Sequence, residues 1–449
     1  MTSRTSLATL AALAALAGGC AQPAPAPQRT VVAFGDVHFD PFFDPSLLAA
    51  LQAAPVGQWA TLFAGSGHTG PGRYGGTTNF TLLQRSLAAI QAQDPQPMLA
   101  VFVGDLLVQD FPQIFRALTG SQDEAALRAF ALKTATFVVR QVRSALGTTP
   151  VYFTLGNWDN YAGSFDLQPD DPFLADTAAL FREDLLLGTA DRATFEATYL
   201  PGGYYAAEAP GTGLVVVSLN SLFLTPGAPS GIEAAVTRQF DWLDATLSAV
   251  QAAGRRAWLV THVPAGGDLA TTGGDVDPQG HLTQATMMLQ APLQARLLGI
   301  LAAHRDALAA VFTGHTHMDE YRIAGVALQG IPGITSLLGN APAFKTFTVA
   351  ADATLLDYAS WALDLSDPSA AFQPTYDFSV AYALPSPLGP SQAALFLELG
   401  TSPAAQSGYR GRYGSGHAPV TPITDLNWPV YRCGIVFMGA EDLASCVNR

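Results

Sequence analysis

An α/β fold is what this sequence predicts, because five short apolar runs each end in a polar residue able to bind a metal. The runs are rich in β-branched and aromatic side chains, which is typical of strands buried on both faces. Open α/β sheets place their functional sites at the carboxyl ends of such strands. The runs are residues 31–34, 101–103, 151–155, 258–260 and 311–313.

The polar segments after these runs share a small set of side chains: Asp, Asn and His. In four of them a glycine comes first, and it is expected to free the backbone to turn. The segments are Gly35-Asp36-Val37-His38, Gly104-Asp105, Gly156-Asn157-Trp158-Asp159, Thr261-His262-Val263-Pro264 and Gly314-His315-Thr316-His317.

Two of the segments carry ligand-type residues two positions apart, namely Asp36 with His38 and His315 with His317. Residues i and i+2 of an extended chain point the same way, so each pair is expected to face one metal region. Imidazole and carboxylate ligands suit zinc, iron or manganese. The lack of thiolates argues against a closed structural zinc site. The chain has only eight histidines, and four of them fall in these segments, which favours a metal site over chance.

The order of these motifs resembles the calcineurin-like metallophosphoesterase superfamily over roughly residues 31–350. The resemblance implies a four-layer α/β/β/α sandwich with a smaller, mostly helical C-terminal part. It also implies two divalent metals, zinc before manganese or iron, bridged by one carboxylate and a hydroxide that attacks phosphorus. The first metal would take Asp36, His38, Asp105 and His317, and the second Asp105, Asn157, His262 and His315. Asp105, Asn157 and His262 would serve catalysis together with the hydroxide.

Trp158 departs from the superfamily, in most of which a histidine follows the asparagine. That histidine is placed to contact the phosphate or to protonate the leaving group, whereas an indole only donates a hydrogen bond. Trp158 is therefore interpreted either as a stacking wall for the substrate or as a space-filling residue. His68 and His281 could replace the missing acid, but their sequence context favours ordinary loop positions.

A narrower resemblance is to the acid-sphingomyelinase-like phosphodiesterases, a group that includes endopolyphosphatase-like enzymes. It is carried by residues 73–76 with the following helical pattern at 82–90, by 155–161, by 262–266, and by the tail from Tyr431 to Cys446. The many extra cysteines of the animal enzymes are absent. Residues 77–79 also stand where an acidic, cysteine-containing segment is expected, so the resemblance does not carry lipid specificity.

The N-terminus has the layout of a secretory signal, with an apolar run at residues 7–16 that is too short to span a bilayer. Small residues before Cys20 resemble a bacterial lipobox. We therefore expect a signal peptide at 1–19, a lipidated Cys20 and a tether at 20–30, in an exported protein of a bacterial cell envelope. The alternative is an ordinary signal peptide with a chance cysteine.

The remaining cysteines, Cys433 and Cys446, are expected to form a disulfide in an exported chain. A thiol metal site is the alternative, but no further Cys or His lies near them. The composition shifts after about residue 352 towards Pro, Gly, Ser and Tyr. These observations predict a catalytic domain at 31–352 and a C-terminal subdomain at 353–449.

The charge balance bears on the substrate. The net charge is −14, and the only lysines are Lys133 and Lys345. A polyanion such as a nucleic acid or long polyphosphate normally needs a basic track, and none is visible. The sequence thus favours an enzyme that hydrolyses small phosphodiesters or monoesters, such as nucleotides or headgroup esters. A monomer is also expected. Endopolyphosphatase is one alternative, and a weakly active protein that keeps its metals as a binding module is another.

Overall fold

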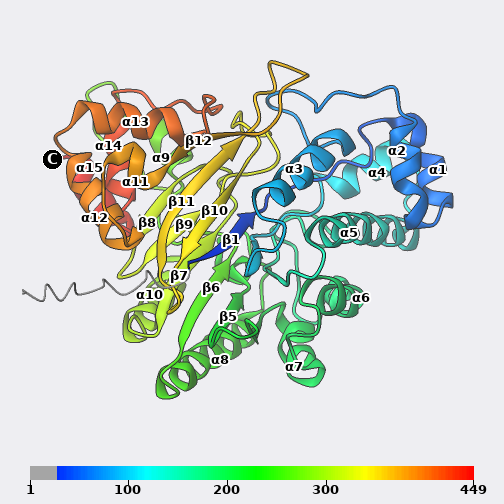
Figure 1. Cartoon of the computed structure of the whole chain (residues 1–449), viewed down its shortest axis with the longest axis horizontal. Helices are drawn as coiled ribbons and strands as arrows, with labels where there is room; N and C mark the ends of the chain where they lie inside the picture. Colours follow the sequence, from blue (N-terminus) through cyan, green and yellow to red (C-terminus); the bar gives the residue numbers. More distant parts are fainter. Residues whose placement is uncertain (1–27) are drawn as a thin grey trace, which may run out of the picture.

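The structure, a computed structural model, describes residues 28–449. The predicted signal peptide, and all of the predicted tether except its last three residues, lie outside the described residues. Two six-stranded sheets form the centre of the molecule (Figure 1). The first has the order β12-β11-β10-β1-β2-β3, and the second has the order β4-β5-β6-β7-β9-β8.

The first sheet is mixed. Strands β1, β2 and β3 run parallel, while β10, β11 and β12 are added antiparallel on the other side of β1. Its strands are β1 (Arg29–Phe34), β2 (Leu99–Phe102), β3 (Val151–Phe153), β10 (Ala343–Val349), β11 (Leu355–Ala362) and β12 (Gln373–Asp377).

The second sheet has four parallel strands, β5, β6, β7 and β9, with β4 and β8 antiparallel at its two edges. Its strands are β4 (Tyr205–Glu208), β5 (Leu214–Leu219), β6 (Arg256–Thr261), β7 (Leu308–Thr313), β8 (Tyr321–Ile323) and β9 (Ala327–Gly330). All five apolar runs are therefore strands, three side by side in one sheet and two side by side in the other.

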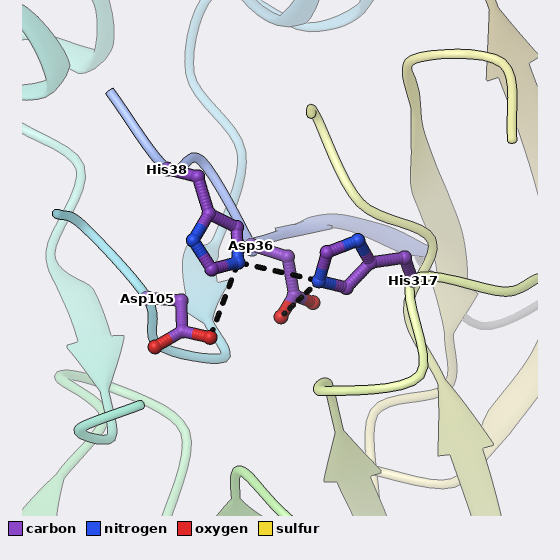
Figure 2. Close-up of side chains that lie close together, drawn as sticks. All are labelled: Asp36, His38, Asp105 and His317. Carbon is purple, nitrogen blue, oxygen red and sulfur yellow. Dashed lines mark hydrogen bonds and ion pairs between the residues drawn. The ribbon is translucent and has the colours of Figure 1, made fainter. Parts of the chain in front are cut away.

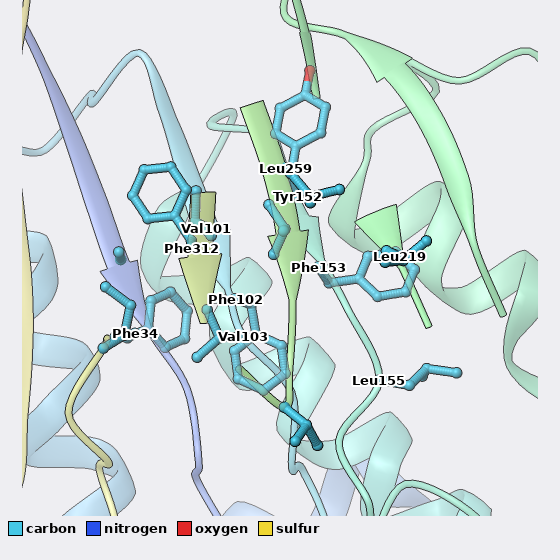
Figure 3. Close-up of a cluster of buried hydrophobic side chains, with 14 of the residues drawn as sticks. Phe34, Val101, Phe102, Val103, Tyr152, Phe153, Leu155, Leu219, Leu259 and Phe312 are labelled. Atoms are coloured by element: carbon cyan, nitrogen blue, oxygen red, sulfur yellow. The ribbon is translucent and has the colours of Figure 1, made fainter. Parts of the chain in front are cut away.

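The two sheets pack face to face through large apolar side chains. Figure 3 shows Phe34 and Phe102 of the first sheet beside Leu259 and Phe312 of the second. The Phe34 and Phe102 rings are 5.4 Å apart, and Phe312 contacts Phe347 of β10 at 5.4 Å. These side chains are almost completely buried. Their burial supplies the main driving force for the sandwich.

Helices cover the outer faces of the sheets, which completes the predicted four-layer α/β/β/α sandwich. Helix α3 contacts β10 and packs on α5, while α8 contacts β5 and β6 and packs on α10. Helix α5 begins after Asp123, whose carboxylate accepts a hydrogen bond from Ala125 N at 2.9 Å. The helices before β8 are α1 (Leu48–Ala53), α2 (Trp59–Ala64), α3 (Phe80–Gln93), α4 (Phe111–Thr119), α5 (Glu124–Leu146), α6 (Pro172–Leu180), α7 (Arg192–Gly202), α8 (Glu233–Ala252), α9 (Leu269–Gly274) and α10 (Ala291–Ala303).

The C-terminal part is mostly helical, as predicted, but it starts later than residue 352. That boundary falls between β10 and β11, so β11 and β12 still extend the first sheet. The helices begin at Phe378 and gather on the side of the strands opposite α1–α5 (Figure 1). They are α11 (Phe378–Tyr382), α12 (Leu388–Glu398), α13 (Pro403–Tyr413), α14 (Trp428–Gly434) and α15 (Ala440–Val447).

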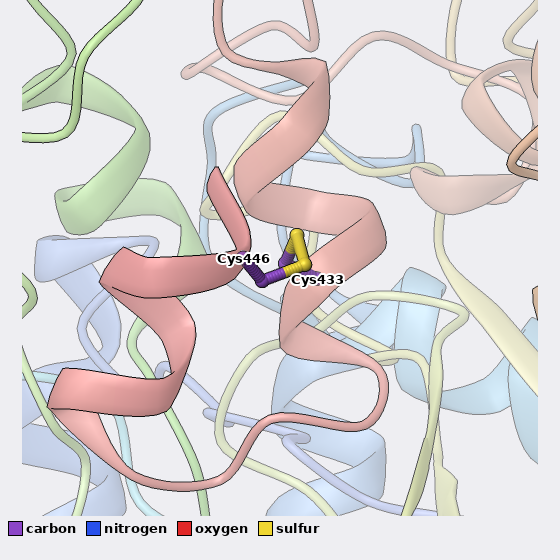
Figure 4. Close-up of a disulfide and its surroundings, with 2 residues drawn as sticks. All are labelled: Cys433 and Cys446. Atoms are coloured by element: carbon purple, nitrogen blue, oxygen red, sulfur yellow. A yellow bond between two sulfur atoms is a disulfide. The ribbon is translucent and has the colours of Figure 1, made fainter. Parts of the chain in front are cut away.

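The predicted disulfide is present. Cys433 of α14 and Cys446 of α15 are bonded, with their Cα atoms 6.0 Å apart (Figure 4). Within residues 28–449, no helix combines the length and the apolar character that crossing a lipid bilayer requires.

Candidate metal centre

The five motif segments follow the carboxyl ends of β1, β2, β3, β6 and β7 and meet at one end of the sandwich. They bring together two groups of possible ligands that share Asp105. Within each group, the ligand atoms lie within 4.8 Å of one another. Figure 2 shows the first group converging from three separate parts of the chain. The groups are Asp36, His38, Asp105 and His317, and Asp105, His262 and His315.

The Oδ2 atom of Asp105 lies at the centre of this arrangement. It is 3.2 Å from Nε2 of His38 and 3.3 Å from Nε2 of His262. On the first side, the Nε2 atoms of His38 and His317 are 3.2 Å apart, and Oδ1 of Asp36 is 3.6 Å from Nε2 of His317. One carboxylate oxygen thus stands between two sets of nitrogen and oxygen ligands, as a bridging ligand would.

Asn157 completes the second group through its amide oxygen. Its Oδ1 lies 3.0 Å from Nε2 of His262 and 2.9 Å from Nδ1 of His315. The amide nitrogen donates to Oγ of Ser164 at 3.1 Å, and this bond turns the oxygen towards the two rings. All seven residues predicted as metal ligands are therefore assembled in one place.

The donor set suits divalent cations. The Nδ1 atoms of His38 and His262 face backbone carbonyls of Leu107 and Val103, at 3.2 and 2.7 Å. Donation to these carbonyls leaves the Nε2 lone pairs directed at the carboxylate and amide oxygens, which are themselves acceptors. The Oδ2 atom of Asp36 is buried and has no hydrogen-bond partner among the described residues. The nitrogen lone pairs and the oxygens therefore face one another with no hydrogen-bond donor from residues 28–449 between them. Such an arrangement needs a positive charge, which bound metal ions would supply.

The pKa values of the ligand residues in the absence of metal also indicate a site that needs positive charge. Burial raises the pKa of Asp36 to about 7. Burial alone would lower the pKa of His262, but the carboxylates of Asp105 and Asp36 outweigh it and raise the value to about 9. Burial, with the charge of His262, lowers the pKa of His315 to about 4. Protons thus partly compensate the buried carboxylates, and metal binding would displace them.

The backbone reaches this geometry through left-handed turns. Asp36, His38, Asp105, His315 and His317 have φ values of 45°, 43°, 60°, 69° and 60°. Non-glycine residues rarely adopt this region, and such strain clusters at functional sites. The prediction that Asp36 and His38 face one metal region is confirmed, although left-handed turns rather than an extended chain direct them there. The same prediction for His315 and His317 is wrong, because these two residues fall in different groups.

The motif glycines serve mainly to allow close packing. Only Gly104 has a positive φ, of 99°. A Cβ atom on Gly156 would lie 2.2 Å from Oδ1 of Asp105, and one on Gly35 would lie 2.3 Å from Cγ2 of Val103. Because glycine has no Cβ atom, three site loops can approach one another closely. This role differs from the expected freedom of the backbone to turn.

Asp159 supports the metal ligands without being one of them. The sequence indicated no role for it, although it is the last residue of the Gly156-Asn157-Trp158-Asp159 motif. It is fully buried, and its carboxylate accepts hydrogen bonds from the backbone nitrogens of Asp105, Leu106 and Gly156 at 2.9, 2.7 and 2.8 Å. Burial and the nearby Asp105 raise its pKa to about 6. Asp159 thereby fixes the turn that presents Asp105.

A cavity of about 310 Å³ opens over the ligand groups. Its lining includes Trp158, whose backbone nitrogen donates to Oδ1 of Asp105 at 2.9 Å. The C-terminal part forms one wall, which contains Tyr413, Val420 and Tyr431. Of the lining residues, all within 28–449, none is Lys or Arg, and Asp268 adds a further negative charge.

The two histidines considered as replacement acids lie elsewhere. Neither His68 nor His281 is among the described residues that line the cavity. The ring of His68 stands edge-on to Phe43, and His281 forms an exposed ion pair with Asp277 at 3.5 Å.

Known proteins resemble this chain in sequence. It is 25% identical over 383 residues to acid sphingomyelinase-like phosphodiesterase 3b of Homo sapiens, a match covering 78% of this chain and 75% of that protein. It is 26% identical to sphingomyelin phosphodiesterase of Homo sapiens, over 65% of this chain but only 46% of that longer protein. A Staphylococcus aureus structure assigned as a 5'-nucleotidase aligns with a TM-score of 0.36 at 14% identity, covering 82% of this chain and 57% of that one, too weak a likeness to support an argument.

These relatives confirm the resemblance to the sphingomyelinase-like group that the motifs indicated. The family model for calcineurin-like phosphoesterases matches residues 29–319, which contain every predicted metal ligand. That match covers most of the chain, so the protein belongs to the calcineurin-like phosphoesterase family and is a hydrolase of phosphoric esters.

Proposed function

We propose that the protein is a dinuclear metal-dependent phosphoesterase that hydrolyses small phosphodiesters or phosphomonoesters, such as nucleotides or headgroup esters. The observation that carries the proposal is the position of Asp105 Oδ2, at 3.2 and 3.3 Å from a histidine nitrogen of each group. Bound divalent ions would supply a nucleophile at neutral pH and offset the negative charge that develops on the phosphoryl oxygens. Imidazole and carboxylate donors favour zinc, with manganese or iron as alternatives.

The residues of the chain have separate tasks in this proposal. Asp105 would be a ligand of both ions, and Asn157 and His262 would be ligands of the second. Asp159 keeps Asp105 in place through three backbone hydrogen bonds. Trp158 lines the cavity and serves as a wall against which the alcohol portion of the ester packs.

The cavity supports a small substrate. Its volume of about 310 Å³ is at the low end for a ligand pocket. A polyphosphate or nucleic acid chain would need cationic side chains along its path, and the lining residues described in 28–449 include none. Endopolyphosphatase activity is therefore the second candidate, favoured by the motif resemblance but not by the charge of the cavity.

A metal reconstitution assay tests the proposal. Chelated protein is reloaded with zinc, manganese or iron, and kcat/KM is measured at fixed moderate salt for bis(p-nitrophenyl) phosphate, a nucleotide, a phosphocholine ester and long polyphosphate. We expect no turnover without metal and a preference for the small esters after reloading. A preference for polyphosphate would favour the second candidate. Two tightly bound metals without turnover of any ester would instead indicate the binding module.

We also propose that the protein is exported as a monomer and held at a membrane through lipidated Cys20. The disulfide between Cys433 and Cys446 supports an oxidising compartment, where such bonds persist. Cys20 lies outside the described residues, so the anchor needs its own test. The variant Cys20→Ala should move the protein from the membrane fraction to a soluble exported fraction. A wild-type protein that is already fully soluble after export would refute the anchor.

A further inference from the structure

A buried ion pair lies directly beside the metal centre. Glu320 and Arg322 each expose only 2% of their surface, and Nη2 of Arg322 lies 3.1 Å from Oε1 of Glu320. Removing two charges from water is costly, and hydrophobic side chains of similar volume often stabilise a core as well or better. A pair at this position therefore needs an explanation other than stability.

The first contact of the pair is with the His315–His317 loop. The hydroxyl of Thr316 donates to Oε1 of Glu320 at 3.3 Å. Thr316 stands between two of the predicted metal ligands, both in the left-handed conformation. Glu320 thus holds the middle of a strained loop from outside the ligand groups.

The second contact is with the loop that carries His262. Nη1 of Arg322 donates to the carbonyl oxygen of Ala265 at 2.8 Å, three residues beyond that histidine. The neighbouring Gly266 has a φ of 107°, and a Cβ atom there would lie 2.7 Å from the same Nη1. The backbone of the loop is thus pressed closely onto the guanidinium group.

The third contact is with the C-terminal wall of the cavity. The hydroxyl of Tyr413 donates to Oε2 of Glu320 at 3.3 Å, and Tyr413 lines the cavity. Backbone hydrogen bonds strengthen the junction, from Asp319 N to Tyr413 O at 2.8 Å and from Ile323 N to Ile435 O at 2.7 Å. The pair therefore touches two ligand loops and the substrate wall at once.

We propose that Glu320 and Arg322 are positioning residues that hold the His262 loop, the His315–His317 loop and the Tyr413 wall in a single arrangement. The inference rests on the proposed function, because it assigns the pair a task at the proposed metal centre. The contacts with Ala265 and Tyr413 fix segments that are distant from the pair in sequence, and the contact with Thr316 fixes the connection that leads from β7 to Glu320. Thr316 and Tyr413 also line the cavity. The pair acts through Thr316, Ala265 and Tyr413, and it does not touch the metals or the substrate.

A second buried ion pair provides a matched control. Nζ of Lys345 lies 2.6 Å from Oδ1 of Asp319, and both side chains are as buried as those of the first pair. Its other side-chain contacts are with Gly330 O of β9 at 2.8 Å, with the hydroxyl of Tyr376 of β12 at 2.9 Å, and with the hydroxyl and ring of Tyr358 of β11. It joins parts of the two sheets, whereas the neighbouring Glu320 faces the site loops.

The test compares the two pairs in the full-length protein. The zinc dissociation constant is measured by chelator competition and Tm by thermal unfolding, for Glu320→Gln and Arg322→Met against Asp319→Asn and Lys345→Met. All four variants should lose stability. Only Glu320→Gln and Arg322→Met should also bind zinc more weakly, by roughly tenfold. Disturbing a group that orients a metal ligand typically weakens metal binding by at least this amount.

Two milder variants keep the test open if the charge variants do not fold. Thr316→Val removes one hydroxyl and should weaken zinc binding with little change in Tm. Tyr413→Phe should leave zinc binding unchanged and raise KM for bis(p-nitrophenyl) phosphate at unchanged kcat. Tyr409→Phe on the same helix serves as its control and should change neither quantity.

The outcomes distinguish a failure of the proposed function from a failure of the role proposed for the ion pair. If wild-type protein binds no zinc, manganese or iron, the proposed function itself fails. If it binds zinc tightly but Glu320→Gln behaves like Asp319→Asn, and Thr316→Val like wild type, the pair only stabilises the fold and the inference is overturned.

Discussion

The carboxylate of Asp159 accepts a hydrogen bond from the backbone nitrogen of Asp105, 2.9 Å away, and both residues are buried. The same carboxylate also accepts from Leu106 and Gly156. Asp105 adopts a φ of 60°, which a non-glycine residue holds only when its surroundings enforce it. Asp159 supplies that enforcement, so the residue common to both ligand groups depends on a residue outside them.

The variant Asp159→Asn should therefore damage the metal centre as well as the fold. An asparagine keeps one acceptor oxygen, but its NH2 group replaces the other oxygen. At least one backbone N–H would then face a second donor and lose its hydrogen bond. Leaving that group unsatisfied should cost about 1–3 kcal/mol of stability. Zinc affinity should fall by roughly tenfold because Asp105 loses its support. Thermal unfolding and metal analysis of the purified variant measure the two effects.

Asp171→Asn provides the control for this prediction. Asp171 is also largely buried and caps α6, where its carboxylate accepts from the backbone nitrogen of Phe173 at 2.8 Å. Asparagine caps a helix about as well as aspartate, so this variant should cost little stability. Its metal content should match wild type. Should Asp159→Asn show the same pattern, the residue would be a structural cap and nothing more.

Asp105→Asn tests the shared ligand directly. Asp105 is the one residue common to both ligand groups among the described residues. A neutral amide in its place gives up the negative charge that would let two dications lie side by side. We expect fewer than two metals per chain and a fall in turnover of at least roughly 100-fold. Two metals per chain with normal turnover would exclude the bridging role.

The strands that position the site could be predicted because they are buried on both faces. Strands β1, β2, β3, β6 and β7 have continuous apolar runs, a signal that needs no knowledge of partners. Strand β11 alternates between buried and half-buried positions, and β12 is largely exposed. Such weak patterns depend on where the neighbouring strand lies, which is why the predicted boundary at residue 352 fell inside the first sheet.

The ligand residues could be found from short motifs, but their geometry and support could not. The left-handed turns at Asp36 and His38 arise because loops from several strands press against one another, which a local pattern does not show. The hydrogen bonds of Asp159 to Asp105, and of Tyr413 to Glu320, join residues 54 and 93 positions apart. For Asp159, the only sequence signal was its place at the end of the Gly156-Asn157-Trp158-Asp159 motif.

The disulfide should stabilise the wall of the cavity. Cys433 and Cys446 are 13 positions apart, and closing a loop of this size contributes about 3 kcal/mol in the chain-entropy model. The double variant Cys433→Ser with Cys446→Ser should therefore lower Tm. Because Tyr431 on the same helix lines the cavity, KM for small esters should also rise. Metal content should stay unchanged, since no predicted ligand lies in this segment.

Peptide mapping without reductant provides the companion measurement. It should recover the two cysteines in one cross-linked fragment. Free thiols at both positions in exported protein would contradict the disulfide and would remove one support for an oxidising compartment.

The replacement of Trp158 by histidine tests how the leaving group departs. Trp158 lines the cavity beside Asp105, and an indole has no proton to give in the useful pKa range. Without an acid, aryl phosphate esters should react far faster than alkyl esters. General acid catalysis is typically worth roughly 10²–10⁴-fold. Trp158→His should thus accelerate alkyl esters selectively and flatten the plot of log kcat/KM against leaving-group pKa.

Trp158→Phe is the matched control, because it keeps an aromatic wall but adds no acid. The backbone hydrogen bond from residue 158 to Asp105 does not depend on the side chain, so both variants should keep their metals. Phenylalanine should leave the slope unchanged. A wild-type slope near zero, with chemistry shown to limit the rate, would mean that another acid already acts in the cavity. A rise in KM for nucleotide or choline esters in Trp158→Ala, without a change in slope, would instead identify Trp158 as a stacking wall.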